Sequence, residues 1–175
     1  IDGHQHKIKQ VVGQEVVIKT VLDRDIDKCK TFFGEAVHCT DNFDDILNDE
    51  EISIIVELIG YVPAAKDYIS KALSAGKHVV SANKDLVALH GKELVNLAKA
   101  NKCDFLYEAA VAGGVPILRA ITESFASDNI QKVMGIVNGT TNFMMTKMDK
   151  EGYSYDEALA LAQELGFAEK NPTSD

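Results

Sequence analysis

Short apolar runs rich in β-branched residues alternate along the chain with longer segments in which apolar residues recur every three or four positions. The first pattern predicts strands and the second predicts helices, because side chains repeat about every 2 residues in a strand and about every 3.6 in a helix. The predicted strands are residues 15–22, 36–39, 53–59, 78–81 and 104–108. The predicted helices are residues 44–47, 64–75, 91–101 and 116–125.

This alternation predicts the fold class. Strands that alternate with helices are typical of βαβ units, which build a parallel sheet. The run ISIIVELI is almost continuously apolar, as is typical of a central strand covered on both faces. Gly76 stands where the helix at residues 64–75 needs a C-terminal cap. We therefore expect an α/β fold with a Rossmann-like, doubly wound parallel sheet over residues 1–128.

The pattern changes near residue 129. A strand-like segment, IQKVMGIVN, leads through a GTT turn into FMMTKMDKEG and then into the helical sequence SYDEALALAQELG. Ser154 suits the N-cap of that last helix, and Asp156 and Glu157 lie in its first turn, where acids stabilise the helix dipole. Residues 129–175 are therefore expected to begin a second domain.

Composition narrows the possible functions. A chain of 175 residues with 46% hydrophobic content can form one full core, or one domain and the start of another. The net charge of −9, without a clustered Lys/Arg face, argues against a nucleic-acid partner. There is no apolar run of about 18 residues for a membrane span, and the first ten residues are too polar for a signal peptide. A cytoplasmic location with no membrane partner is the expectation.

The cysteines predict no cross-link. Three cysteines without CxxC spacing indicate neither a disulfide framework nor a structural zinc site. We expect Cys29, Cys39 and Cys103 to be buried free thiols.

The segment LYEAAVAGGVP carries the strongest local signal for a functional turn. Gly113 and Gly114 can adopt positive φ and let a ligand or an ion approach the backbone. Pro116 suits the first turn of the following helix. Glu108 stands just before the turn, at the C-terminal end of a predicted parallel strand, where functional residues are common.

Other strand ends also carry candidate ligand-binding residues. Arg24 lies between Asp23 and Asp25, where a dinucleotide fold contacts the adenosine ribose; an acid suits a 2′-hydroxyl and an arginine a 2′-phosphate. An ordinary surface turn explains this triplet equally well. Lys84 in the sequence SANK can hold a carbonyl or a carboxylate, and Gly60 after VELI permits close approach of a cofactor.

The two ends of the chain raise separate questions. Glu169 and Asp175 flank the loop FAEKNPTSD, and they can bind a substrate ammonium group or simply be solvated. No GxGxxG turn for a pyrophosphate is present, although a dinucleotide fold normally opens with one. The chain is therefore expected to be cut at both ends.

Five motifs in this order resemble homoserine dehydrogenase. They are VELIG, GKHVVSANKDLVALHGKEL, YEAAVAGGVPILRA, GIVNGTTNF and ALALAQELGFAEKNPTSD, and the resemblance extends from Val16 to the end. It implies NAD(P)-dependent interconversion of L-homoserine and L-aspartate 4-semialdehyde, on the branch leading to threonine and methionine. It further implies that residues 129–175 begin a substrate-binding and dimerisation domain, and that the full-length protein is a homodimer.

The resemblance also implies roles for individual residues. Lys84 matches a lysine that contacts both cofactor and substrate, Glu169 matches the glutamate that binds the homoserine amino group, and Asp175 is similar to an acid of the same loop. The implied cofactor-binding residues are Arg24, Gly60, Ser81, Lys84 and Gly139. A sodium ion is implied at Glu108, Val111, Gly113 and Val115, mostly through carbonyl oxygens, and a tight turn stiffened by its own hydrogen bonds is the alternative.

The chain departs from the family pattern in three places. The Gly-rich phosphate loop is expected before Ile1, and the catalytic aspartate and the proton-donating lysine beyond Asp175, so no catalytic residue is assigned within the chain. Tyr61 replaces a glycine usual after VELIG. The chain alone is expected to be inactive.

Two other functions remain open. A non-catalytic nucleotide-binding or interaction module on a degenerate Rossmann scaffold also explains the missing motifs. Another semialdehyde or amino-acid dehydrogenase is disfavoured by the motifs between Gly135 and Asp175, because they lie in the substrate part.

Overall fold

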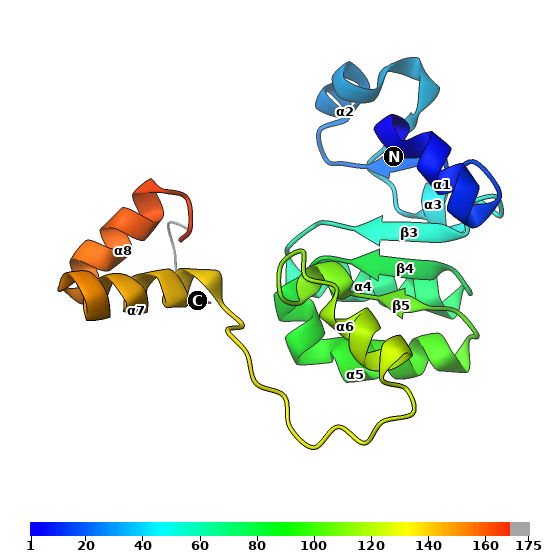
Figure 1. The fold of residues 1–175 in the computed structure, drawn as a ribbon. Coiled ribbons are helices and arrows are strands. Elements are labelled where there is room, and N and C mark those ends of the chain that lie inside the picture. Colours follow the sequence, from blue (N-terminus) through cyan, green and yellow to red (C-terminus); the bar gives the residue numbers. More distant parts are fainter. Residues whose placement is uncertain (169–175) are drawn as a thin grey trace. The chain divides into compact units, whose positions relative to one another are not determined.

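The computed structural model describes residues 1–168 of the chain. The chain divides into two compact units, Ile1–Ala110 and Val111–Asp175, and Figure 1 labels most of their helices and strands. Each unit has its own hydrophobic core. No helix among residues 1–168 has the length and apolar character needed to cross a bilayer.

The first unit contains parallel strands in two sheets. One sheet pairs two strands, and the other has the order β3-β4-β5. The strands are β1 (Thr20–Leu22), β2 (His38–Thr40), β3 (Ile54–Glu57), β4 (His78–Ser81) and β5 (Phe105–Leu106). All pairs are parallel, which confirms the predicted parallel architecture. Most strands are shorter than predicted, because only the paired part of each apolar run forms a ladder.

The order of the strands fits a doubly wound fold. A common dinucleotide-binding sheet has the order 3-2-1-4-5-6. The two ladders, β2-β1 and β3-β4-β5, are compatible with the segments 3-2 and 4-5-6 of that order. Within residues 1–168 no strand pairs with both β1 and β3, so the strands form two separate ladders.

Helices pack against the larger sheet and create the core of the first unit. This unit contains η1 (Asp2–His4), α1 (Gln5–Val12), α2 (Ile26–Phe33), η2 (Gly34–Ala36), α3 (Asp44–Leu47), α4 (Val62–Ser74), α5 (Lys84–Ala100) and η3 (Glu108–Ala110). The two longest, α4 and α5, pack on each other and on β3-β4-β5 (Figure 1). Their largest fully buried side chains are Ile69, Leu73, Leu86 and Leu94, which share one hydrophobic cluster with Val79 of β4.

Within the first unit, side chains on the other face of this sheet are exposed, and this corrects one expectation. Ile54 and Val56 of β3 are 52% and 57% exposed, and Leu106 of β5 is 58% exposed. We predicted a central strand covered on both faces. Among the described residues α4 and α5 cover only one face of the sheet. The continuous apolar run therefore indicates a strand, but it does not indicate which elements cover that strand.

The prediction of free thiols is wrong for two of the cysteines. Cys29 of α2 and Cys39 of β2 form a disulfide, with their Cα atoms 6.0 Å apart, and Cys103 is the buried free thiol. The packing of α2 against β2 brings the two sulfur atoms together. This approach depends on tertiary structure, and their separation of 10 residues in sequence does not reveal it.

The second unit is helical in its described part. It contains α6 (Ile117–Arg119), the π-helical turn η4 (Ala120–Ser124), α7 (Gly139–Glu151) and α8 (Tyr155–Glu164). The last two pack on each other through Met144, Ala158 and Ala162. The predicted cap of α8 is confirmed: Ser154 and Glu157 form a capping box, in which each side chain accepts a backbone N–H hydrogen bond from the other residue.

The strand-like segment at residues 130–138 does not form a strand. Val133, Ile136 and Val137 are 69%, 75% and 86% exposed, and the segment has no regular structure. A strand needs a neighbouring backbone to satisfy its N–H and C=O groups. The regular elements within residues 111–168 are helices, so the β-branched pattern has no ladder to join.

Candidate site at the carboxyl ends of β3 and β4

Two neighbouring strands end side by side and bring three predicted residues to one edge of the larger sheet. Glu57, the last residue of β3, pairs in register with Ser81, the last residue of β4. Gly60 follows β3 with φ of +74°, and a Cβ placed there would meet nothing within 4 Å. Lys84 is the first residue of α5. Ligands of open parallel sheets bind at this carboxyl edge, so the fold brings Gly60, Ser81 and Lys84 to the expected place.

The turn between β4 and α5 is held by side-chain hydrogen bonds. Ser81 is fully buried, and its Oγ accepts a hydrogen bond of 3.1 Å from the backbone N–H of Asn83. Asn83 caps α5, because its Oδ1 accepts a hydrogen bond of 3.0 Å from the N–H of Leu86. Lys84 is exposed in the first turn of this 17-residue helix. A cation beside the positive end of a helix dipole forms a local field suited to anionic or carbonyl oxygens.

Glu57 is a polar residue of this edge that the sequence analysis missed. It is only 4% exposed. Its Oε2 accepts a hydrogen bond of 2.6 Å from the Ser81 hydroxyl, and its Oε1 accepts one of 2.7 Å from the N–H of Ile59. The signal was present in the sequence, since a carboxylate inside an apolar run is unusual in a strand and must find partners when buried.

Arg24 lies at the end of β1, in the smaller sheet. The acids beside it hold the turn: Asp23 Oδ1 accepts the N–H of Asp25 at 2.9 Å, and Asp25 Oδ1 accepts the N–H of Lys28 at 3.0 Å as the N-cap of α2. Arg24 itself is exposed. The turn therefore presents a guanidinium on a backbone that its neighbours stabilise.

The glycine turn is tight and strained in one position. Ala112, Gly113 and Gly114 have φ of +55°, +40° and +83°. Positive φ is uncommon for alanine, and no feature of the sequence predicts it at Ala112. The carbonyl of Val115 accepts a hydrogen bond of 2.8 Å from the N–H of Ile117. Val111, Gly113 and Val115 lie in this turn at the start of the second unit, whereas Glu108 opens η3 at the end of the first.

The remaining predicted residues lie elsewhere. Gly139 is the first residue of α7 in the second unit, directly after the N-cap Asn138. Glu169 and Asp175 lie outside the described residues. Among residues 1–168 no group of three or more His, Cys, Asp or Glu side chains is arranged to hold a metal ion.

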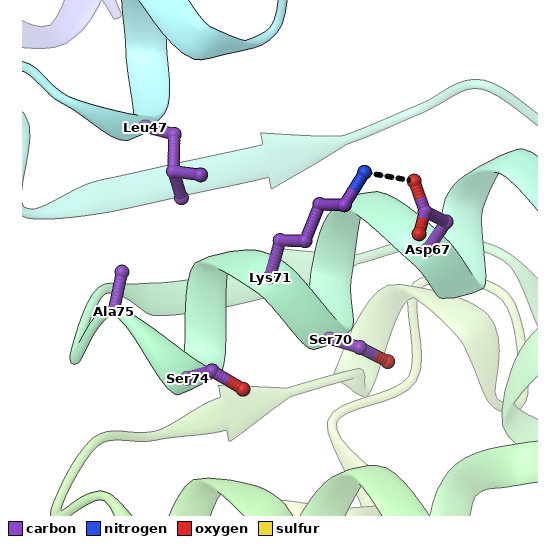
Figure 2. A pocket seen from close by; sticks show the side chains of 6 residues that line it. All are labelled: Leu47, Asp67, Ser70, Lys71, Ser74 and Ala75. Carbon is purple, nitrogen blue, oxygen red and sulfur yellow. Dashed lines mark hydrogen bonds and ion pairs between the residues drawn. The ribbon is translucent and has the colours of Figure 1, made fainter.

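A surface hollow of about 430 Å³ lies away from this edge (Figure 2). It is lined by Leu47 at the end of α3 and by α4 residues that include the ion pair between Lys71 and Asp67, whose Nζ and Oδ2 are 2.7 Å apart. Ala75, which also lines it, precedes the start of β4, so the hollow is near the opposite end of the strand from Ser81. We assign no chemistry to it.

Comparison with known proteins identifies related sequences over the whole chain. Residues 2–108 match a family model described as homoserine dehydrogenase, NAD binding domain, and residues 116–175 match a model described as homoserine dehydrogenase. The homoserine dehydrogenase of Lactococcus lactis is 50% identical over 178 aligned residues, which cover 100% of this chain and 41% of the relative.

Solved structures agree with these matches. A homoserine dehydrogenase from Thiobacillus denitrificans is 39% identical with a TM-score of 0.90, over 99% of this chain and 40% of that one. A hyperthermophilic archaeal homoserine dehydrogenase in complex with NADPH is 26% identical with a TM-score of 0.78, over 98% of this chain and 59% of that one.

The matches cover different shares of this chain and of its relatives. This chain spans about two fifths of the length of the Lactococcus and Thiobacillus proteins. The NAD-binding model alone covers more than half of this chain, including the edge where Gly60, Ser81 and Lys84 meet. On that ground the chain is a member of the homoserine dehydrogenase family.

Proposed function

We propose that the full-length protein interconverts L-homoserine and L-aspartate 4-semialdehyde with NADP or NAD as the cofactor. The observation that carries this proposal is the edge formed by β3 and β4, where an open glycine turn and a lysine at a helix N-terminus lie within a matched NAD-binding domain. The similar archaeal enzyme in complex with NADPH supports a nicotinamide cofactor.

The residues of this chain supply binding and orientation. The nicotinamide, when bound, donates or accepts the hydride. Gly60 lets the cofactor approach the backbone after β3, because no side chain occupies that space. Lys84 binds the substrate oxygen and the cofactor with its ammonium group at the positive end of α5. Glu169 and Asp175 bind the substrate, with the Glu169 carboxylate on the amino group. Gly139 completes the cofactor-binding set, and the fully buried Ser81 belongs to this set through the turn that it holds before Lys84.

Arg24 governs the choice between NADP and NAD in this proposal. Its guanidinium is exposed at the end of β1, and a planar fork of donors suits a 2′-phosphate. Arg24→Ala in the full-length protein should weaken NADP binding and leave NAD binding nearly unchanged, as measured by titration of the reduced cofactors. Unchanged NADP affinity would show that Arg24 does not bind the 2′-phosphate.

A sodium ion at the glycine turn is part of the same proposal. Val111, Gly113 and Val115 would contribute backbone carbonyl oxygens, and Glu108 would complete the set, because hard cations prefer oxygen ligands. The irregular backbone, with three successive positive φ values from Ala112 to Gly114, supports this assignment. We further propose a cytoplasmic homodimer in threonine and methionine biosynthesis, with cofactor binding in residues 1–128 and the start of a substrate-binding and dimerisation domain in residues 129–175.

The decisive test is a steady-state assay on the full-length protein. Homoserine should drive reduction of NADP or NAD, and Lys84→Ala should lower kcat/KM by about 100-fold, as loss of an electrostatic donor to a reacting oxygen commonly does. Lys92→Ala removes another exposed lysine of α5 and should leave kcat/KM unchanged. The isolated 175-residue chain should show no turnover. A full-length protein that binds cofactor without oxidising homoserine would instead support a non-catalytic nucleotide-binding module.

A further inference from the structure

A chain of hydrogen bonds connects a buried carboxylate to the first turn of α5. Glu57 and Ser81 face each other across β3 and β4 in register, and both side chains are buried. The Ser81 hydroxyl donates to Glu57 Oε2 at 2.6 Å and accepts from the Asn83 N–H at 3.1 Å. Asn83 then caps α5 through the Leu86 N–H at 3.0 Å. Lys84 lies between the two anchored positions, Asn83 and Leu86.

The carboxylate of Glu57 determines which group donates and which accepts in this series of hydrogen bonds. An ionised carboxylate only accepts hydrogen bonds, so both Ile59 N–H and Ser81 O–H must donate to Glu57. The single hydroxyl proton of Ser81 is thereby committed to Glu57, and its lone pairs face the Asn83 N–H. A glutamine at position 57 could present its NH₂ group to Ser81, which would leave the hydroxyl proton without its acceptor.

Burying the Glu57 carboxylate costs free energy, and this cost bears on why an acid stands at this position. Taking a carboxylate out of water is unfavourable unless its partners compensate. A neutral pair would join β3 to β4 at lower cost, so fold stability alone gives little reason for an acid at Glu57, which is 4% exposed. The acid instead fixes the orientation of the Ser81 hydroxyl, and thereby of the turn that precedes Lys84.

We propose that Glu57 and Ser81 are positioning residues, which set the place of Lys84 at the cofactor and substrate through Asn83. This inference rests on the proposed function for the role of Lys84. Ser81 therefore acts through the turn, because its side chain is fully buried. Glu57, which is 4% exposed, likewise acts through Ser81 and touches neither substrate nor cofactor.

The test is a double-mutant cycle in the full-length protein. Glu57→Gln and Ser81→Ala should each lower kcat/KM for homoserine by about tenfold, the size expected for loss of one hydrogen bond to a charged group. In the Lys84→Ala background the same changes should have no further effect, because there is no ammonium group left to position. An equal additional loss in that background would overturn the inference. If Glu57→Gln fails to fold, Ser81→Ala carries the same test.

Lys77→Met is the matched control. Lys77 is 7% exposed at the start of the β4 ladder, and its Nζ donates to the carbonyls of Asp49 and Ile52 at 2.7 and 2.6 Å. This variant removes a buried charged group with two hydrogen bonds at the other end of the strand. It should lower the melting temperature without coupling to Lys84→Ala.

Hydrogen exchange gives a second measurement that does not need activity. Glu57→Gln should speed exchange of the Asn83 and Leu86 amides, whereas Lys77→Met should not. Unchanged exchange at both amides would contradict the positioning role. A wild-type protein without homoserine-dependent turnover would contradict the proposed function instead, and the exchange rates would still decide whether Glu57 orders the first turn of α5.

Discussion

At the scale of single residues, Asn83 connects the end of β4 to the start of α5. Its side-chain oxygen accepts a hydrogen bond from the N–H of Leu86, and its own N–H donates to Ser81. Asn83 is 8% exposed, so water cannot easily replace these contacts. The sequence indicated Lys84 beside it as functional, whereas the hydrogen bonds that hold Lys84 in place became visible only in the folded structure.

Asn83→Ala should lower the free energy of unfolding by about 1 kcal/mol, because the N-cap oxygen is lost and the Leu86 N–H stays buried without an acceptor. Asn83→Ser keeps a capping oxygen and should retain most of the stability. Chemical denaturation of both variants measures the difference. Equal loss in the two would show that the cap contributes nothing.

The cysteines give a second prediction at this scale. Burial raises the pKa of the Cys103 thiol above its ordinary 9.0, so less thiolate is present at neutral pH than in an exposed cysteine. Cys29 and Cys39 are joined. Under non-reducing conditions an alkylating reagent should label none of the three before unfolding and only Cys103 after it. Labelling of all three after unfolding would contradict the disulfide.

At the scale of elements, the sequence predicted where helices lie along the chain better than it predicted which segments pair as strands. Helices over Asp44–Leu47, Val62–Ser74 and Lys84–Ala100 lie at or around the predicted ranges, because amphipathic spacing is a local signal. The segment at residues 130–138 has the β-branched pattern of a strand and forms none in the described structure. Strand formation depends on a distant neighbour, and the sequence of one segment does not report whether that neighbour is present.

The capping box of α8 was predictable, and it yields a pH-dependent prediction. Hydrogen bonds from the backbone N–H and the side chain of Ser154 lower the pKa of Glu157 below its ordinary 4.5. A carboxylate with a lowered folded pKa stabilises the helix above its unfolded pKa. That contribution is lost as pH falls through the folded value.

Ser154→Ala should therefore destabilise α8 by about 1 kcal/mol at neutral pH. The difference between variant and wild type should shrink as the pH falls from 4.5 through the lower folded pKa of Glu157 in the wild type. Ser154→Thr is the matched control, because it keeps the hydroxyl. Circular dichroism during thermal unfolding at several pH values measures this, and a difference that does not change with pH would exclude Glu157 from the effect.

At the scale of the molecule, topology brings the site together. Gly60, Ser81 and Lys84 are separated in sequence but meet at one edge because β3 and β4 are parallel and adjacent. Parallel order was predictable from the alternation of strands and helices, and so was this shared edge. Glu57 was not singled out, although its place inside an apolar run was a signal; its partners Ser81 and Ile59 are visible only in the folded structure. Glu169 and Asp175, the other predicted substrate contacts, lie outside the described residues.

The most direct measurement is a crystal structure of the full-length protein with NADP and homoserine bound. We predict that the Lys84 ammonium group contacts both ligands at the carboxyl edge of β3 and β4, with Glu57 and Ser81 still hydrogen-bonded beneath the turn. Cofactor or substrate bound at another edge, with Lys84 pointing to solvent, would contradict it.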